Sequence, residues 1–313
     1  MATNAHVQSA EHHDDADAFD DPDAVWLTYD WSAVTHDAVV ASRAVRYVDV
    51  GSGPTVILIH GQGGCWQWWL RVIPSLARTS RVIAVDLAGF GASEVAVGDA
   101  FYAQSAIVLS LLDQLGESTA TVVGHSMGGL VALAVAADHP ERVAGLVLVN
   151  GGAVPVARRR LGLILVGMRL AHAALSQPRI CRWIATTVWA HRCFFASGVV
   201  DPASVSPALA AILVPAMGAP GFVATMRAAV RARDEINRAR IKCPALVVWG
   251  ARDRILTVGM ARSLVAQMSG AELVVFDDVG HCPMIEAPTR LAAEFRRFTG
   301  APRDNEGSRV DGP

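Results

Sequence analysis

The chain has 313 residues, of which 52% are hydrophobic and 18% are charged, and its formal net charge at pH 7 is −2. A chain of this length buries roughly 75% of the surface that its unfolded form exposes, so a large core is available. The near-neutral charge provides no basic field for a polyanion, and we therefore expect no nucleic-acid partner.

Both ends of the chain are polar and lack the hydrophobic periodicity of packed elements. Residues 1–25 contain the run EHHDDADAFDDPDA at 11–24, which predicts a disordered acidic tail rather than a signal peptide. Residues 301–313 predict a second disordered tail. The five cysteines form neither a CxxC pair nor a disulfide framework, which favours reduced thiols and a cytoplasmic location.

No uninterrupted apolar run reaches the roughly 18 residues that a membrane span needs. The nearest run, Leu161–Leu175, is interrupted by Arg169 and His172 and is preceded by three arginines at 158–160. This pattern predicts an amphipathic helix with a charged first turn, and it leaves contact with a membrane surface as an alternative.

Short β-branched runs alternate with helix-length stretches along most of the chain. The predicted strands are 55–59, 81–85, 120–123, 145–149, 245–249 and 272–276, and the predicted helices are 101–115, 127–139, 258–268 and 287–298. Most of the strand runs are continuously apolar, as in parallel strands that are buried on both faces. Residues 26–151 and 242–300 are therefore predicted to form one open α/β core.

The alternation stops between residues 152 and 241. This segment is rich in alanine, arginine and valine at helical spacing, and Pro178, Pro202 and Pro220 punctuate it, which predicts three to five helices. A helical insertion ahead of the last strands predicts a cap over the carboxyl edge of the sheet, where open α/β sheets bind ligands.

The segment Gly124-His125-Ser126-Met127-Gly128 fits the pattern G-x-S-x-G between a predicted strand and an alanine-rich helix. A tight turn at this place holds the serine in a strained conformation, with its hydroxyl above the sheet, and glycines at 124 and 128 allow the close packing that the turn requires. The alternative interpretation is an ordinary serine N-cap. We predict that Ser126 is a nucleophile.

A serine hydroxyl needs a base, and the base needs an orienting carboxylate. His281 follows the last predicted strand, and Asp253 follows the strand before it. Asp277 and Asp278 are alternatives to Asp253 as the orienting carboxylate, but they lie in the same loop after the last predicted strand as His281 itself. The order Ser126, Asp253, His281 along the chain is the one known for catalytic triads in open α/β sheets.

The oxyanion of an acyl-transfer reaction needs backbone donors. We expect the N–H groups of Met127 and Gln62, with Gly63 as the alternative to Gln62, because residues 60–64 are rich in glycine. Two interpretations of the tryptophans at 66, 68 and 69 are equally good: they line an apolar entrance to the site, or they pack in the core. The residues expected to contact substrate are Gly61, Gly63, Trp66 and His125.

Five motifs in this order resemble the α/β-hydrolase fold superfamily over roughly residues 45–298: HGQGG at 60–64, DLAGFGAS at 86–93, GHSMGG at 124–129, WGARD at 249–253 and GH at 280–281. The resemblance implies a mostly parallel eight-stranded sheet flanked by helices, with the helical cap inserted after the sixth strand. Ala88 departs from the pattern, because relatives commonly carry proline there.

The resemblance also narrows the reaction. Haloalkane dehalogenases and epoxide hydrolases of this superfamily use aspartate where Ser126 stands, so their reactions are not expected. Carbon–carbon bond hydrolases keep the serine but usually show a proline in the oxyanion loop and a tryptophan after the histidine, where this chain has Gly64 and Cys282.

These features predict a serine hydrolase that cleaves a carboxylic ester of a small, lipophilic substrate through an acyl-enzyme, without cofactor or metal. Acyl transfer, lactone, thioester or carbon–carbon bond cleavage on the same triad, and a ligand-binding receptor that retains the fold, are the alternatives. The lipophilic preference depends on apolar side chains of the cap: Ile164, Met168, Trp183, Phe194, Phe195 and Phe222. Oligomeric state cannot be predicted.

Overall fold

The computed structural model describes residues 23–40, 42–95, 101–153 and 161–300. The two predicted tails lie outside these residues, except for 23–25. Helix α1 (Ala24–Thr28) begins inside the predicted N-terminal tail, and the buried Asp23 before it forms an ion pair of 2.6 Å with the buried Arg71. The packed part of the chain thus starts earlier than the predicted boundary at residue 25.

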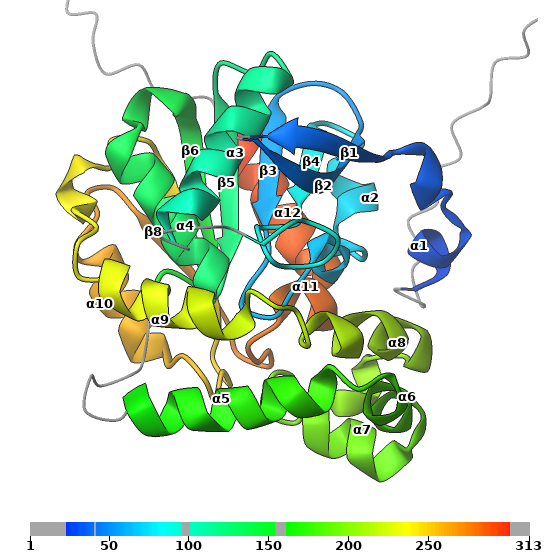
Figure 1. Ribbon diagram of the computed structural model, residues 1–313. Coiled ribbons are helices and arrows are strands. Elements are labelled where there is room, and N and C mark those ends of the chain that lie inside the picture. The colour runs from blue at the N-terminus through cyan, green and yellow to red at the C-terminus, as the bar shows by residue number, and fades with distance from the viewer. Residues whose placement is uncertain (1–22, 41, 96–100, 154–160, 301–313) are drawn as a thin grey trace, which may run out of the picture.

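Eight strands form one sheet in the order β1-β2-β4-β3-β5-β6-β7-β8 (Figure 1). The six strands from β4 to β8 along this order run parallel to one another, whereas β2 pairs antiparallel with both of its neighbours, β1 and β4. The predicted fold class is therefore confirmed. The strands are β1 (Thr35–Val40), β2 (Arg43–Val50), β3 (Thr55–Ile59), β4 (Arg81–Val85), β5 (Ala120–His125), β6 (Val143–Val149), β7 (Ala245–Gly250) and β8 (Glu272–Phe276).

The hydrophobic runs located six of these strands but neither β1 nor β2. Most side chains of β1 are exposed or half-buried, and in β2 Arg43, Arg46 and Asp49 interrupt the apolar residues. Strands at the solvated end of a sheet need only one apolar face, so they lack the continuous apolar run of the central strands.

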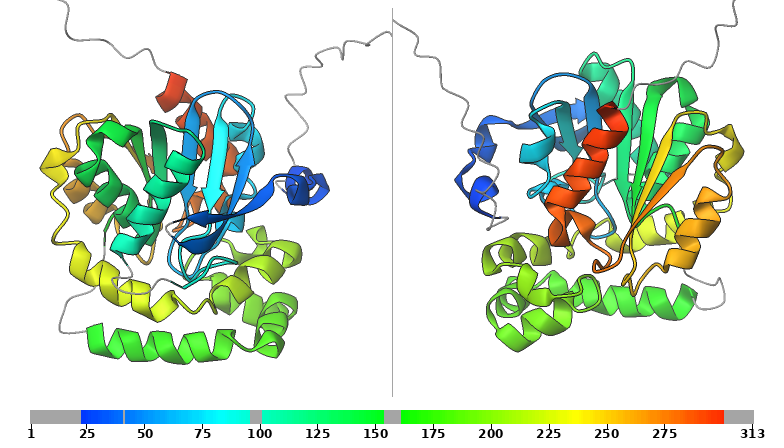
Figure 2. Two further views of the ribbon diagram at one scale, coloured as in Figure 1. Left: turned by 45° about the horizontal axis from the view of Figure 1, so that its top comes forward. Right: turned by 180° about the vertical axis from the view of Figure 1, so that it is seen from behind.

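Helices cover both faces of the sheet (Figures 1 and 2). Alternate side chains of β3 enter opposite cores: Ile57 and Ile59 pack on one side, and Val56 and Leu58 on the other. The first core includes α3 (Tyr102–Gln114), α4 (Met127–Asp138) and α10 (Val258–Val265), and the second includes α2 (Ile73–Leu76), α11 (Pro283–Glu286) and α12 (Pro288–Gly300).

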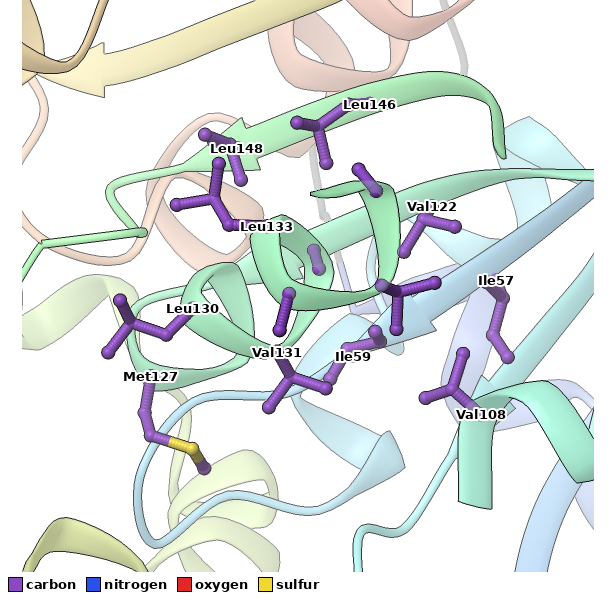
Figure 3. Packing of buried hydrophobic residues seen from close by; sticks show 14 of the residues in the cluster. Ile57, Ile59, Val108, Val122, Met127, Leu130, Val131, Leu133, Leu146 and Leu148 are labelled. Atoms are coloured by element: carbon purple, nitrogen blue, oxygen red, sulfur yellow. The ribbon is translucent and has the colours of Figure 1, made fainter. Parts of the chain in front are cut away.

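Helix α4 is buried on all sides from Met127 to Ala137. Figure 3 shows Leu130, Val131 and Leu133 of this helix among side chains of β3, β5 and β6. Burial of the apolar side chains, at about 1.5–3 kcal/mol each, anchors the helix to the sheet. The turn that leads into α4 is therefore held on a rigid base.

Five helices of the described chain lie between β6 and β7: α5 (Leu161–Leu175), α6 (Pro178–Thr186), α7 (Val188–Phe195), α8 (Pro207–Ala216) and α9 (Phe222–Ala232). They lie along the lower edge of the sheet in Figure 1. None of the described helices combines the length and the apolar character that crossing a bilayer requires. Short 3-10 turns occupy Trp31–Ala33, Trp66–Trp69, Pro140–Arg142, Pro202–Ser204 and Arg238–Arg240.

Candidate active site

Ser126 lies in a strained turn between β5 and α4. Its backbone has φ 51° and ψ −117°, a conformation that costs a non-glycine residue about 1–3 kcal/mol. The Ser126 N–H donates to the carbonyl of Val149 at 3.1 Å, and the Ser126 carbonyl accepts from the N–H groups of Gly129 and Gly152 at 3.1 and 3.2 Å. These bonds to the neighbouring strand and helix hold the turn in place.

Glycine is required on both sides of this turn. A Cβ atom at Gly124 would lie 2.4 Å from the carbonyl oxygen of Gly128, and one at Gly128 would lie 2.4 Å from the carbonyl oxygen of His60. Both contacts are with backbone, which cannot move aside cheaply. The predicted reason for the glycines, close packing at the turn, agrees with these distances.

The three residues predicted to form a triad meet in one hydrogen-bonded chain. His281 Nε2 lies 3.0 Å from Ser126 Oγ, and His281 Nδ1 lies 2.7 Å from Asp253 Oδ2. A carboxylate only accepts, so Nδ1 carries the proton and Nε2 is left to accept from the serine hydroxyl. This arrangement is the one that general-base activation of a serine requires.

Asp253 is buried, and each of its two carboxylate oxygens accepts two hydrogen bonds. Its Oδ1 accepts from the N–H groups of Ile255 and Leu256 at 2.7 and 2.9 Å, and its Oδ2 accepts from Asn150 Nδ2 at 2.7 Å as well as from His281. Burial by itself raises the pKa of a carboxyl group, but the bonds from His281, Asn150 and Leu256 outweigh it and hold the pKa of Asp253 below its ordinary value. Asp253 is therefore an ionised partner for the imidazole.

Asn150 is a site residue that the sequence analysis missed. It follows β6 directly, has φ 41°, and is fully buried. Besides Asp253, its Nδ2 donates to the carbonyl of Gly280 at 3.1 Å, and its Oδ1 accepts from the N–H of Gly250 at 3.0 Å. One signal in the sequence could have pointed to Asn150. It is an asparagine at the end of a strand and before two glycines, and asparagine tolerates the positive φ that a tight turn at such a place requires.

The loop that carries His281 is fastened to the cap. The His281 N–H donates to the carbonyl of Gly198 at 2.9 Å. Glu286 accepts from the Gly280 N–H at 3.0 Å through Oε1 and from the Val200 N–H at 2.7 Å through Oε2. Burial raises the pKa of Glu286. This carboxyl group, also missed in the sequence, ties a cap segment to the catalytic loop.

The backbone donors predicted for the oxyanion are at Met127, which directly follows Ser126, and at Gln62 in the glycine-rich loop 60–64. The N–H groups of Met127 and Gln62 have no acceptor within the described part of the chain. The side-chain amide of Gln62 donates to the carbonyl of Phe222 in the cap. Gly63 has φ 71°, and a Cβ atom there would lie 2.7 Å from the Phe222 ring. The predicted oxyanion loop is thus packed against α9.

His60 at the start of this loop is fully buried and bonded at both nitrogens. Its Nδ1 donates to the carbonyl of Gly61 at 2.8 Å, and its Nε2 accepts from the N–H of Leu87 at 3.0 Å. Burial lowers the pKa of His60 to about 4, so the ring is neutral and structural.

Two of the predicted substrate contacts occupy packing positions. His125 is buried; its Nε2 donates to the carbonyl of His281 at 2.9 Å, its ring lies 4.9 Å from the His281 ring, and burial lowers its pKa to about 3. The buried Trp66 packs its ring 5.3 Å from that of Trp31. Gly61 borders the site itself, since a Cβ atom there would lie 3.0 Å from Ser126 Cβ and 2.8 Å from His125 Nδ1.

The structure gives a reason why Ala88 can replace the common proline. The Ala88 N–H donates to Gln104 Oε1 at 2.8 Å, and the Ala88 carbonyl accepts from Gln104 Nε2 at 3.1 Å. Proline has no N–H and could make only the second bond. The buried Gln104 therefore fixes the loop that a proline would otherwise stiffen.

Cys65 and Cys282, which are close to the site in sequence, are buried free thiols. Burial raises the pKa of both. Because the thiolate is the reactive form, neither cysteine is set up as a nucleophile.

The α/β-hydrolase fold family matches residues 54–288, and the chain belongs to this family. It is 31% identical over 283 residues to the 2-hydroxymuconate semialdehyde hydrolase of Pseudomonas sp. (strain CF600), covering 83% of this chain and 92% of that protein.

Two further relatives carry other activities. The acetyltransferase component of the acetoin cleaving system of Pseudomonas putida is 32% identical over 273 residues, covering 83% of this chain and 68% of that protein. The enol-lactonase from Burkholderia xenovorans LB400 superposes with a TM-score of 0.68 at 25% identity, covering 85% of this chain and all of that chain (100%). The chain is thus an α/β hydrolase among relatives with different reactions.

Proposed function

We propose that this protein is a serine hydrolase that cleaves a carboxylic ester through an acyl-enzyme intermediate. The observation that carries the proposal is the continuous hydrogen-bonded chain from Asp253 through His281 to the hydroxyl of the strained Ser126. A buried, ionised carboxylate, a histidine in the matching tautomer and a half-buried turn serine are the parts that acyl transfer needs.

In the first half of the reaction, Ser126 Oγ attacks the carbonyl carbon while its proton passes to His281 Nε2. The oxyanion accepts hydrogen bonds from the N–H groups of Met127 and Gln62, each of which is worth about 3–4 kcal/mol in comparable sites. The tetrahedral intermediate collapses, the carbon–oxygen bond to the alcohol breaks, and His281 gives its proton to the leaving alcohol. Water then attacks the acyl-enzyme by the same steps and releases the acid.

Apolar side chains near the oxyanion loop support a lipophilic substrate. The Phe222 ring packs on Gly63, and Met217 lies beside it, with its Cγ 3.3 Å from the position of a Cβ atom at Gly63. These groups border the predicted oxyanion loop from the cap side. The enol-lactonase among the similar structures acts, by its name, on a cyclic ester, which agrees with an acyl–oxygen bond as the target.

Carbon–carbon bond cleavage is the second candidate, because the semialdehyde hydrolase is 31% identical over most of both chains. By its name, that enzyme hydrolyses 2-hydroxymuconate semialdehyde. Gly64 and Cys282, in place of the proline and tryptophan typical of such hydrolases, favour the ester over this candidate.

The test combines active-site labelling with two substrate series. Wild-type protein, Ser126→Ala and His281→Ala are treated with a fluorophosphonate probe and assayed on p-nitrophenyl esters of increasing acyl length and on a 2-hydroxy-6-oxodienoate. We expect labelling and fast ester turnover in the wild type and the loss of both in the two variants, which should remain folded by circular dichroism. Faster dienoate cleavage would select the second candidate, and tight ligand binding with negligible turnover would select a receptor.

A further inference from the structure

The first half of the cap is strongly basic. Residues 142–200 contain no aspartate or glutamate, whereas residues 158–200 contain seven arginines. Four of these arginines lie in the described helices α5, α6 and α7, and all four are exposed and have no carboxylate partner among the described residues: Arg169, Arg179, Arg182 and Arg192. The whole chain has a net charge of only −2, so this positive charge is a local feature.

The same three helices expose large apolar side chains. Leu170 on α5 is 69% exposed, Val188 on α7 is 68% exposed, and the neighbouring Trp189 is 60% exposed. Trp183 on α6 is 46% exposed, and its ring lies 5.0 Å from that of Trp189. A group of large apolar side chains that remains in solvent marks a contact surface.

Arginines and apolar residues share the same stripe on each helix. On α6, Arg179, Arg182 and Trp183 stand at the spacing i, i+3, i+4, and on α5 Val166, Arg169 and Leu170 repeat that spacing. Residues at this spacing lie on one face of a helix. Each helix therefore presents a mixed face of cations and apolar groups to solvent.

Helices α5, α6 and α7 form the outermost layer of the cap, and we call their exposed residues the outer cap surface. Figures 1 and 2 show α8 and α9 between this layer and the sheet. The outer cap surface faces away from the core, so a broad, flat partner can reach it without contacting the rest of the molecule.

We propose that the outer cap surface docks on an anionic lipid bilayer. Arginines attract anionic headgroups, tryptophan rings favour the headgroup level, and the exposed valine and leucine side chains suit the acyl boundary just below it. Nucleic acid would use the arginines but would leave the aliphatic side chains in water. A bilayer uses both parts of each stripe.

The test is a vesicle flotation assay with the full-length protein. Vesicles of phosphatidylcholine alone are compared with vesicles of equal parts phosphatidylcholine and phosphatidylglycerol, and some carry brominated acyl chains that quench tryptophan fluorescence. Two multiple variants are compared with the wild type, Trp183→Ser with Trp189→Ser, and Arg179→Gln with Arg182→Gln and Arg192→Gln. The control is Val39→Ser with Arg297→Gln, which removes an exposed apolar group and a cation from β1 and α12, away from the cap.

We expect the wild type and the control to bind anionic vesicles, to be released by salt, and to be quenched by the brominated chains. Each cap variant should bind about tenfold more weakly. The proposal is overturned if the wild type does not float, if it binds neutral vesicles equally well, or if the cap variants bind like the wild type. It is also overturned if the variants abolish only self-association in size-exclusion chromatography, which would assign the surface to a second copy of the chain.

Discussion

The two reacting side chains of the candidate triad are held in different ways. Ser126 is fixed by its immediate surroundings, a strand before it, a buried helix after it, and glycines whose missing Cβ atoms let backbone approach backbone. His281 stands in a loop that is held by Gly198 of the cap, by Glu286, which also bonds the cap residue Val200, and by Asn150 by way of Asp253.

The fold thus positions the two side chains of the candidate site in two different ways. The serine turn packs tightly against core backbone, including that of His60 and Val149, so changes there should be felt mainly in folding stability. The histidine loop is a tertiary structure that includes the cap, so changes in its supports should be felt mainly in turnover. The cap therefore does more than cover the carboxyl edge of the sheet, because its segment 198–200 is part of what positions the base.

The largest expected effect belongs to the serine turn. Gly128→Ala places a Cβ atom 2.4 Å from the His60 carbonyl oxygen, and we expect it to lower the free energy of unfolding by about 3 kcal/mol, at the upper end of overpacking effects. Chemical denaturation measures this loss. Gly167→Ala in α5, where a Cβ atom meets nothing within 4 Å, is the matched control and should be neutral or stabilising. Equal stability of the two variants would contradict the tight packing of the turn against the His60 backbone.

The second effect concerns two buried histidines on either side of the serine turn. Burial lowers the pKa of His60 to about 4 and of His125 to about 3, so their stabilising contribution is present above pH 6.5 and is lost as pH falls toward those values. Asp86, whose pKa burial raises to about 6, acts in the opposite direction and offsets part of the loss below pH 6. We expect the free energy of unfolding to fall by about 2 kcal/mol between pH 6.5 and 5.

Urea unfolding at a series of pH values checks this prediction. His125→Gln retains a donor for the His281 carbonyl but removes one titrating group, so the pH dependence should become clearly shallower in that variant. A variant with the wild-type slope would show that His125 is not the group that takes up the proton.

The third effect tests the support behind Asp253. Asn150→Ala removes one donor to the buried carboxylate and the acceptor of the Gly250 N–H, and we expect kcat/KM for ester hydrolysis to fall about tenfold, as for a lost hydrogen bond to a charged group. Steady-state kinetics measure the change. Asn237→Ala, at an exposed turn where the side chain accepts from the Ala239 N–H, should leave kcat/KM unchanged. Full activity of the Asn150 variant would remove this residue from the site.

The smallest effect belongs to the tie between the cap and the histidine loop. In Glu286→Gln only one side-chain oxygen can accept, so either Gly280 or Val200 loses the partner of its N–H. We expect kcat to fall about threefold, as for a net hydrogen-bond contribution near the lower end of the usual range, with the protein still folded. Glu141→Gln at an exposed position is the control. An unchanged kcat would mean that the Glu286 carboxylate does not help to position His281.

The sequence alone located the central strands and predicted both the helical segment between β6 and β7 and a candidate triad of Ser126, Asp253 and His281. These predictions depended on signals that are local in the chain: continuous apolar runs, a glycine-flanked serine between strand and helix, and polar residues at strand ends. Physical constraints of this kind act between near neighbours, so they leave a pattern that can be recognised without knowing which distant residues meet.

Only the tertiary structure decided the contacts across the chain. Asn150 meets Asp253 from 103 positions away, and His125 meets the carbonyl of His281 from 156 positions away, so no spacing rule could have assigned either of them to the support of the base. The same holds for Trp66 and for β1 and β2 at one end of the sheet, whose burial depends on what packs against them. Residue type indicates what a side chain can do, but its partner depends on how separate parts of the chain come together in the folded core.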